Sequence, residues 1–307
     1  MGFIGSNYVR HLLTSGREVS KVTVFDKFTY ASNQRNLADF ASDERLSIFR
    51  GDICRFDLLQ EKMSNHDFVL HFAAESHVDR SILDPTSFVE TNFLGTYNVL
   101  EAARVTGVKT IVHVSTDEVY GSTLEGSFEE KDLLAPNSPY SASKAGSDLL
   151  CRSYFVTHGL DVRVTRSCNN YGRFQYSEKV IPVMINSVLK EKNLPIYGSG
   201  KNVREWIHVI DHCKAIQLVL EAGNKGEIYN VGTGFHLTNL ELASKILTKM
   251  GSNTSKVEFV EDRKGHDFRY SVNFDKLRNL GFNPAVNFEE GLDQTIRWYR
   301  ENQDWWA

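Results

Sequence analysis

Two short, largely apolar stretches, 68–74 and 110–115, constrain the fold more than any other feature of this 307-residue sequence. Neither alternates polar and apolar residues as a half-exposed strand does, so both are expected to be strands buried on both faces. Between them lies a helical pattern over 85–106, with Pro85 near its start and Gly107 after its end. Buried strands joined by helices predict an α/β protein with a parallel, doubly wound sheet.

The alternation of strands and helices continues on both sides of this region. Residues 22–26 predict a short strand that ends in Asp26, and further strands are expected at 161–166 and 227–232. From about Asn169 the sequence becomes richer in loops, which we interpret as a smaller mixed α/β substrate-binding lobe that interrupts the sheet domain. The expected division is a dinucleotide-binding sheet domain of residues 1–168 and 203–233, and a second lobe of residues 169–202 and 234–307.

Composition argues against several classes of protein. The net charge is -4 and no long basic block is present, which argues against a general nucleic-acid binder. No apolar run approaches the length that spans a bilayer, and no secretory leader is evident at the N-terminus. The cysteines show neither metal-ligand spacing nor the density of a disulfide framework, so free thiols, no metal site and a cytoplasmic location are expected. They are Cys54, Cys151, Cys168 and Cys213.

The first residues resemble the second half of a dinucleotide-binding turn. Gly2 and Gly5 precede an apolar helix through Leu13, so backbone amides at the helix N-terminus can approach a pyrophosphate. Asp26 follows Gly5 by 21 residues, at the end of the next strand, where a carboxylate binds a ribose 2'-hydroxyl and disfavours a 2'-phosphate. NAD is therefore expected in preference to NADP. Asp52, after the following strand, either contacts the adenine or is simply a turn acid.

The strand and the first glycine that should precede this turn are absent from the sequence. In a doubly wound sheet this first strand lies in the middle, so its loss exposes both neighbours and removes part of the pyrophosphate turn. Our hypothesis is that the start of the chain is set too late. If the protein begins at Met1, both NAD affinity and stability are expected to suffer.

Four reactive side chains are predicted to meet at one site. Tyr140 and Lys144 stand four residues apart within a helical run over 138–158, so they share one face. The ammonium is expected to lower the pKa of the phenol, which then acts as a base toward a sugar hydroxyl. Asp117 and Glu118 follow a strand, and adjacent acids push their titrations apart. The alternatives are an ordinary tyrosine–lysine pair on a helix and a solvated acidic pair on a loop.

Ten motifs extend along nearly the whole chain. They are 2–7, 26–31, 51–53, 72–81, 115–121, 140–145, 169–172, 178–182, 204–206 and 265–267. Together they resemble the dTDP-glucose 4,6-dehydratases, a family of extended short-chain dehydrogenase/reductases with a Rossmann-type fold. The departures from the family pattern fall in loops. Arg173, Ser177 and Lys264 stand where the family usually has proline, and Ser32 stands where it has glycine.

This resemblance implies an NAD-dependent hydro-lyase that converts dTDP-glucose to dTDP-4-keto-6-deoxyglucose for deoxysugar biosynthesis, for example of rhamnose. Tyr140, assisted by Thr116 and Lys144, would take the proton of the 4-hydroxyl while the C4 hydride passes to tightly bound NAD. Glu118 would then remove the C5 proton and Asp117 would protonate the departing 6-hydroxyl. The hydride returns to C6, so the cofactor is regenerated in each turnover.

The resemblance also implies the remaining site residues. Those expected to bind the cofactor are Phe3, Ile4, Asp26, Lys27, Thr29, Ser32, Asp52, Ile53, Phe72, Ala73, Ala74, Ser76, Thr91, Tyr140, Lys144 and Asn170. Those expected to bind the nucleotide sugar are Ser76, Thr116, Asn169, Lys179, Val180, Pro195, Tyr197, Arg204, Asn239, Arg263 and His266. For Asn239, at the start of a helix, a capping role fits as well as a phosphate contact.

By the same resemblance we expect a homodimer, in which the helices near 85–106 and 138–158 of two copies form a four-helix bundle. The apolar surface would come from Ala102, Ala103, Val105, Leu149, Leu150 and Tyr154, although core packing explains the same pattern. Related activities stay open: a UDP-sugar 4,6-dehydratase, a 4-epimerase, a UDP-glucuronate decarboxylase and a non-catalytic NAD-binding protein. Asp117 and Glu118 argue against the epimerase, which needs no acid and base for dehydration, and the decarboxylases usually have serine in place of Asp117. The sequence does not separate dTDP from UDP.

Overall fold

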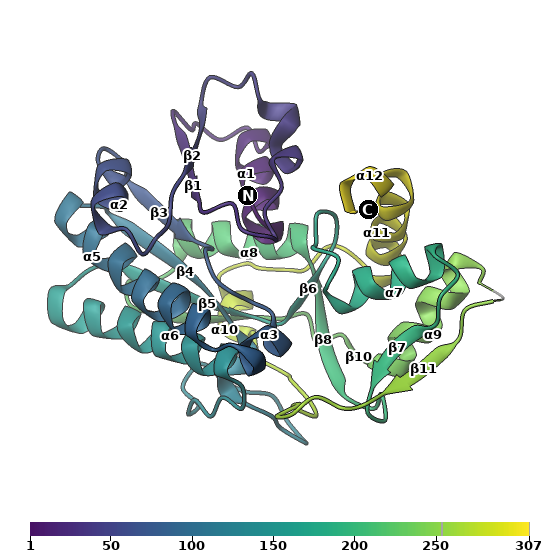
Figure 1. Ribbon diagram of the computed structural model, residues 1–307. Coiled ribbons are helices and arrows are strands. Elements are labelled where there is room, and N and C mark those ends of the chain that lie inside the picture. Colours follow the sequence, from purple (N-terminus) through teal and green to yellow (C-terminus); the bar gives the residue numbers. More distant parts are fainter. Residues whose placement is uncertain (253, 307) are drawn as a thin grey trace.

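A parallel four-stranded sheet forms the centre of the computed structural model, which describes residues 1–252 and 254–306 (Figure 1). Its order is β3-β4-β5-β9, and every pair is parallel, as predicted. The strands are β3 (Phe68–His71), β4 (Thr110–Thr116), β5 (Val162–Ser167) and β9 (Ile228–Val231). Neighbouring residues of β4 face opposite sides: Ile111 packs with α5 (Thr96–Thr106) and α6 (Pro139–His158), and Val112 packs with α8 (Val209–Ala222). The α/β doubly wound prediction is confirmed.

A second, separate parallel pair is formed by β1 (Val22–Asp26) and β2 (Leu46–Arg50). Within the described residues, no strand pairs with the remaining edge of β1 or of β3, so the sheet is in two pieces. The gap lies where the missing first strand was expected. In Figure 1, β1 and β2 lie beside α1 (Phe3–Thr14), which packs on α8.

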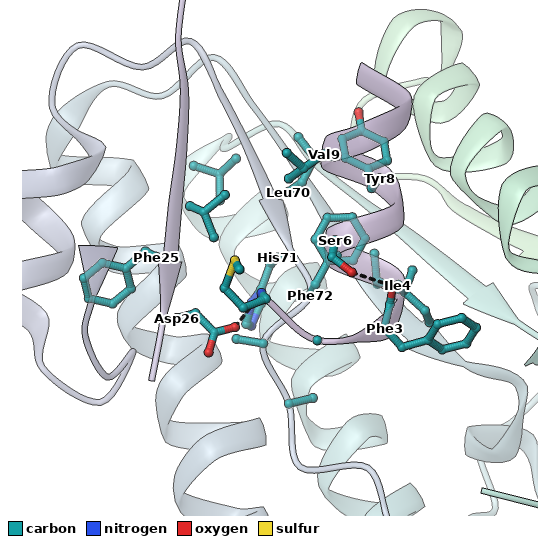
Figure 2. Close-up of a pocket in the computed structure, with 18 of the residues that line it drawn as sticks. Phe3, Ile4, Ser6, Tyr8, Val9, Phe25, Asp26, Leu70, His71 and Phe72 are labelled. Carbon is teal, nitrogen blue, oxygen red and sulfur yellow. Dashed lines mark hydrogen bonds and ion pairs between the residues drawn. The ribbon is translucent and has the colours of Figure 1, made fainter. Parts of the chain in front are cut away.

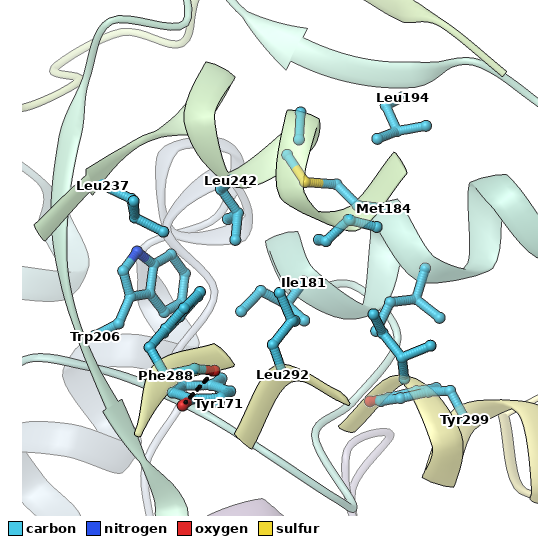
Figure 3. Close-up of a cluster of buried hydrophobic side chains, with 14 of the residues drawn as sticks. Tyr171, Ile181, Met184, Leu194, Trp206, Leu237, Leu242, Phe288, Leu292 and Tyr299 are labelled. Carbon is cyan, nitrogen blue, oxygen red and sulfur yellow. Dashed lines mark hydrogen bonds between the residues drawn. The ribbon is translucent and has the colours of Figure 1, made fainter. Parts of the chain in front are cut away.

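The second lobe has its own hydrophobic core (Figure 3). Its strands are β6 (Asn169–Tyr171), β7 (Leu194–Tyr197), β8 (Val203–His208), β10 (His236–Thr238) and β11 (Val257–Val260). Its helices are α7 (Val180–Leu189), α9 (Asn239–Met250), α11 (Phe288–Glu301) and α12 (Gln303–Trp306). One sheet has the order β10-β8-β6 and β7 pairs with β11, so β8 joins strands of the second lobe rather than β9.

The helical pattern over 85–106 is less regular than predicted. It comprises α4 (Thr86–Phe88), the π-helical turn η2 (Val89–Gly95) and α5. Asn92 in η2 hydrogen-bonds both the backbone N–H (2.8 Å) and the carbonyl (3.0 Å) of Glu75. The residues after His71 are therefore held by a helix rather than by the sheet, and β3 ends earlier than the expected strand.

Shorter elements complete the chain. They are η1 (Gln34–Phe40), α2 (Phe56–Met63), α3 (Val78–Leu83), η3 (Asp117–Tyr120) and α10 (Asp275–Asn279). Within the described ranges, no helix is both long and apolar enough to cross a membrane. The four cysteines are free thiols, and only Cys54 among them is not fully buried.

Candidate active site

A cavity of about 1200 Å³ opens at the carboxyl ends of β1, β3 and β4. Every residue that the sequence assigned to the cofactor lines it, from Phe3 and Asp26 to Tyr140 and Asn170. Thr116, Asp117 and Glu118 also line it. Dinucleotides bind at this edge of doubly wound sheets, so the position fits NAD. The cavity continues along the open edges of β1 and β3, past side chains such as Leu70 (Figure 2).

The N-terminus of α1 faces this cavity. Its N-cap, Gly2, has no side chain to bond the first amides of the helix, which leaves them for an anion. A Cβ added at Gly5 would lie 3.6 Å from the Phe72 ring, so the turn packs closely on the end of β3. These features fit a pyrophosphate.

Asp26 is held at the end of β1 by three hydrogen bonds. Its carboxylate accepts them from the Met1 amino group, the Phe28 amide and the Ser32 hydroxyl, each at 2.7 Å. Burial alone would raise the pKa of Asp26, but the positive charge of Met1 and these hydrogen bonds lower it below its ordinary value. The carboxylate is therefore ionised, as a ribose acceptor needs to be. Lys27 pairs with Asp52 at 2.6 Å.

The acidic pair lies where β4 passes into η3. Thr116 caps η3, and its Oγ1 accepts from the Glu118 amide at 3.3 Å. The same hydroxyl contacts Asp117 Oδ1 at 3.3 Å. Asp117 is buried, and its Oδ2 has no hydrogen-bond partner among the described residues. A buried oxygen without a partner costs free energy unless it is protonated or meets a ligand.

The environments of the two acids differ. Burial, then Glu118, then Glu205 raise the pKa of Asp117 well above its ordinary value. Burial also raises the pKa of Glu118, but Arg263, Arg204 and Lys179 oppose it. The surroundings of Asp117 therefore favour its protonated form, whereas the cations around Glu118 favour its charged form. The solvated-pair alternative is wrong, because Asp117 is buried.

Tyr140 and Lys144 lie in the first turns of α6. The helix begins with a capping box between Ser138 and Ser141, with Pro139 in its first turn, so its start is well defined. Both functional side chains are buried and line the cavity.

The pKa of Tyr140 differs from the expectation. Burial raises it above its ordinary value, Glu118 adds to this, and a hydrogen bond with Thr116 opposes both. The lowering expected from Lys144 is not seen, since the Lys144 Nζ donates instead to the Val114 carbonyl at 2.8 Å and lies 3.4 Å from His113 Nε2. Burial lowers the pKa of Lys144 to about 8.

Part of the predicted sugar-nucleotide set meets the acidic pair. Asn169, Ser76 and Lys179 line the cavity, and the Lys179 Nζ donates to the Ser76 carbonyl at 2.6 Å. Arg204 is buried and donates to the carbonyls of its own lobe, with Nη2 at 2.9 Å from the Asp267 oxygen. Arg263 lies 3.8 Å from Asp79.

Other predicted residues lie outside the lining of this cavity. They are Val180, Pro195, Tyr197, Arg204, Asn239, Arg263 and His266. Tyr197 and His266 contact each other edge to face, with ring centroids 6.2 Å apart. The capping role for Asn239 is wrong, because Thr238 caps α9 in a capping box with Glu241.

Sequence reasoning missed two residues around the acids. The Tyr270 hydroxyl donates to Asp267 at 2.6 Å and lies 3.4 Å from Glu118 Oε2. Its ring lies under the Arg204 guanidinium, 4.3 Å from its carbon. Glu205 is fully buried and contributes to the raised pKa of Asp117. Tyr270 lies three residues after the motif at 265–267, which was the only signal for it in the sequence.

Comparison with known proteins identifies the family. A family model described as GDP-mannose 4,6 dehydratase matches residues 1–295. A dTDP-glucose 4,6-dehydratase from Streptomyces niveus is 51% identical over an alignment of 309 positions, which covers 99% of this chain and 92% of the relative. The crystal structure of the dTDP-glucose 4,6-dehydratase DesIV from Streptomyces venezuelae, with NAD bound, matches with a TM-score of 0.97 at 51% identity, covering 100% of this chain and 96% of that one.

A UDP-glucose 4-epimerase from Thermotoga maritima shares the fold at a TM-score of 0.90 but only 27% identity, covering 98% of this chain and 97% of that one. Sequence identity to this chain is thus about twice as high for these dehydratases as for this epimerase. With half of its residues matching such enzymes over nearly its whole length, the chain belongs to the dTDP-glucose 4,6-dehydratase family of extended short-chain dehydrogenase/reductases.

Proposed function

We propose that this chain converts dTDP-glucose to dTDP-4-keto-6-deoxyglucose by the following division of roles. The observation that carries the proposal is the pair Asp117 and Glu118, which share a cavity with Tyr140 and Lys144 but have different environments. Loss of water from C5 and C6 needs an acid and a base together, and an epimerase needs neither.

The residues that hold NAD are those of the turn and of the adjoining strand ends. Amides of α1 bind the pyrophosphate, Asp26 accepts from the ribose, and Asp52 lies toward the adenine. When bound, NAD would supply the hydride chemistry, taking the C4 hydride and returning it to C6, and C5 would regain a proton to complete the product. Tyr140 removes the proton of the 4-hydroxyl, and Thr116 orients that hydroxyl. Burial raises the pKa of Tyr140. The role proposed for Lys144, one helical turn away, is to oppose this with the positive charge that a phenolate needs.

A carbonyl at C4 acidifies the hydrogen at C5, so a carboxylate can remove it. Glu118 takes this proton, because the cations that face it favour its charged form. Asp117 gives a proton to the 6-hydroxyl, which leaves as water. Its raised pKa favours the protonated form that this step needs.

The cations of the second lobe bind the nucleotide. Lys179, Arg204, Arg263 and His266 face the diphosphate, where guanidinium groups match phosphate oxygens. Asn169 contacts the sugar, Pro195 and Tyr197 contact the base, and Asn239 contacts phosphate. Residues 1–168 and 203–233 bind NAD, and residues 169–202 and 234–307 bind the nucleotide sugar, with β8 shared between them. A cytoplasmic location suits this substrate and the free thiols.

A homodimer is also part of the proposal. Several apolar side chains on η2, α5 and α6 are exposed, including Phe93, Tyr97, Val105 and Leu149. The interface set named from sequence changes, because Ala102 and Ala103 are fully buried and Tyr154 nearly so. The mass of the protein in solution, compared with that of Leu149→Glu, tests this. A wild-type monomer would contradict it.

Incubation with NAD and dTDP-glucose tests the function. We expect a nucleotide sugar lighter by one water in the mass spectrum. An isomer of unchanged mass would instead indicate an epimerase. The same assay with UDP-glucose shows whether the protein prefers a thymine or a uracil nucleotide. Glu118→Gln is the matched variant, in which the nucleotide sugar should not lose water.

A further inference from the structure

Behind the Tyr140–Lys144 pair lies a buried group of charged side chains that the proposed reaction does not use. The Lys144 Nζ lies 3.4 Å from His113 Nε2, on β4. One helical turn after Lys144, Asp148 places its Oδ1 3.7 Å from the same nitrogen. Both side chains are almost wholly buried. The ammonium and the carboxylate therefore both approach Nε2 of the same imidazole.

Asp148 is held from its other side. Its Oδ2 accepts from Arg166 Nε at 2.8 Å, while its Oδ1 has no hydrogen-bond partner within the described residues. Arg166 in turn donates to the Tyr120 hydroxyl at 2.7 Å. The carboxylate is thus fixed in place, with its free oxygen toward His113 and Lys144.

The groups around Lys144 come from three elements. From β3 comes His71, whose ring lies 5.1 Å from that of His113 on β4. Burial lowers the pKa values of both imidazoles, that of His71 to about 3, so both are neutral. On α6 itself lie Tyr140, Asp148 and Cys151, whose thiol stays protonated because burial raises its pKa.

Among these described neighbours, Asp148 is the only carboxyl group. A buried ammonium is costly unless an anion compensates it. No carboxylate of residues 1–252 or 254–306 lies within ion-pair distance of Lys144, so the compensation by Asp148 acts over more than 4 Å, beside the imidazole nitrogen that both groups approach.

We propose that Asp148 is a positioning residue for the Tyr140–Lys144 pair: anchored by Arg166, its carboxylate keeps Lys144 protonated from beside the His113 nitrogen that both side chains approach. This rests on the role proposed for Lys144. Asp148 touches neither sugar nor cofactor in this scheme, and it acts on the phenol through the lysine.

The test is a pH titration of Lys144 in protein labelled with ¹³C-lysine, followed by NMR at its ε-carbon and assigned by Lys144→Met. In Asp148→Asn we expect the titration midpoint to fall by about one pH unit, because the ammonium loses its anion. In Arg166→Gln we expect it to rise, because the aspartate loses its competing cation. Two shifts of opposite sign are not expected of a merely structural network.

Asp161→Asn is the matched control. Asp161 lies just before β5 and pairs at 2.7 Å with Arg163, which is on β5 as Arg166 is. Neither residue of this pair contacts Lys144. This variant should leave the midpoint unchanged even where it lowers the melting temperature, and Asp148→Glu should restore the midpoint toward the wild-type value. An unchanged midpoint in folded Asp148→Asn overturns the proposal. If that variant does not fold, an unchanged or lowered midpoint in Arg166→Gln overturns it.

A second readout is the pH profile of NADH formation with dTDP-6-deoxyglucose, which lacks the 6-hydroxyl and so stops after oxidation. The alkaline limb should move to lower pH in Asp148→Asn. If the wild-type protein forms no NADH, the proposed function fails. If it does and the profiles coincide, the proposal for Asp148 alone fails.

Discussion

The two pieces of the parallel sheet differ in how they bury similar sequences. β4 pairs on both edges and is covered on both faces, and six of its seven residues are buried. β1 has a comparable apolar sequence, but it pairs on one edge only and none of its five residues is fully buried. An apolar strand therefore gains its full stabilisation only when both of its edges and both of its faces are covered.

This difference assigns separate tasks to the two pieces. The intact sheet carries β4, which leads into the acidic pair at the start of η3, and it packs against α6, which carries Tyr140 and Lys144. The β1–β2 piece supplies Asp26 and its neighbours, for which the proposed role is to hold one end of the dinucleotide. Chemistry and cofactor retention should therefore respond to substitutions independently.

Tyr140→Phe should have the largest effect. Removal of the phenol should lower kcat by 10²–10⁴-fold, which is typical for loss of an acid–base group. Asp26→Asn, in the other piece, should weaken NAD binding and leave kcat at saturating NAD within a few-fold of wild type. Steady-state kinetics with dTDP-glucose, and calorimetric titration of NAD, measure both. Equal losses of kcat in the two variants would contradict the proposed separation of catalysis from cofactor binding.

An added strand should stabilise the open piece. We expect a segment of about six β-branched residues, placed before Met1, to pair with β1 and β3 and to raise the free energy of unfolding, because each added ladder hydrogen bond contributes roughly 1 kcal/mol. This gain should exceed the loss of the ion pair between the Met1 amino group and Asp26. Thermal melts with and without NAD measure this. A polar segment of equal length is the control. Matching melts of the lengthened and original proteins would show that the gap is harmless.

A matched pair of valines sharpens the comparison within the sheet. Val112→Ala, in β4 where the side chain is fully buried, should cost about 2 kcal/mol of unfolding free energy. Val24→Ala, in β1 beside the cavity, should cost less than about 1 kcal/mol, because its side chain already borders open space. Urea denaturation measures the unfolding free energy of both variants. Equal losses of unfolding free energy would mean that the β1–β2 piece is as well packed as the central sheet.

The same contrast explains what the sequence could predict. Strands at 22–26, 110–115 and 161–166 were found within a residue or so, because continuous apolar runs bounded by turns are local signals. The early end of β3 was not found, because it depends on Asn92, 17 residues away from Glu75. Pairing of β8 with β6 and β10 likewise depends on contacts between distant segments.

For the site, the types of residue were predictable and their charge states only partly so. The different environments of Asp117 and Glu118 followed from adjacency, but the cations responsible come from the second lobe. The raised pKa of Tyr140 did not follow, because spacing on a helix says nothing about how far burial outweighs a nearby charge. Tyr270 and Asp148 carry no motif of their own and needed the structure.

The smallest expected effect is on how stability depends on pH. It has opposite signs for Asp26, in the β1–β2 piece, and for Asp117, which follows β4. The pKa of Asp26 is lowered in the folded state, so this group contributes stability above its unfolded pKa, near 4, and loses it as the pH falls. The pKa of Asp117 is raised, so the folded state holds its proton longer and stability falls as the pH rises above about 4. At neutral pH, Asp26→Asn should therefore lower the melting temperature and Asp117→Asn should raise it, each by a few degrees. Melting curves between pH 4 and pH 8 test both, and the two differences from wild type should shrink toward the acid end. Shifts of the same sign in both variants would mean that burial, and not the local partners of each carboxyl, decides its charge state.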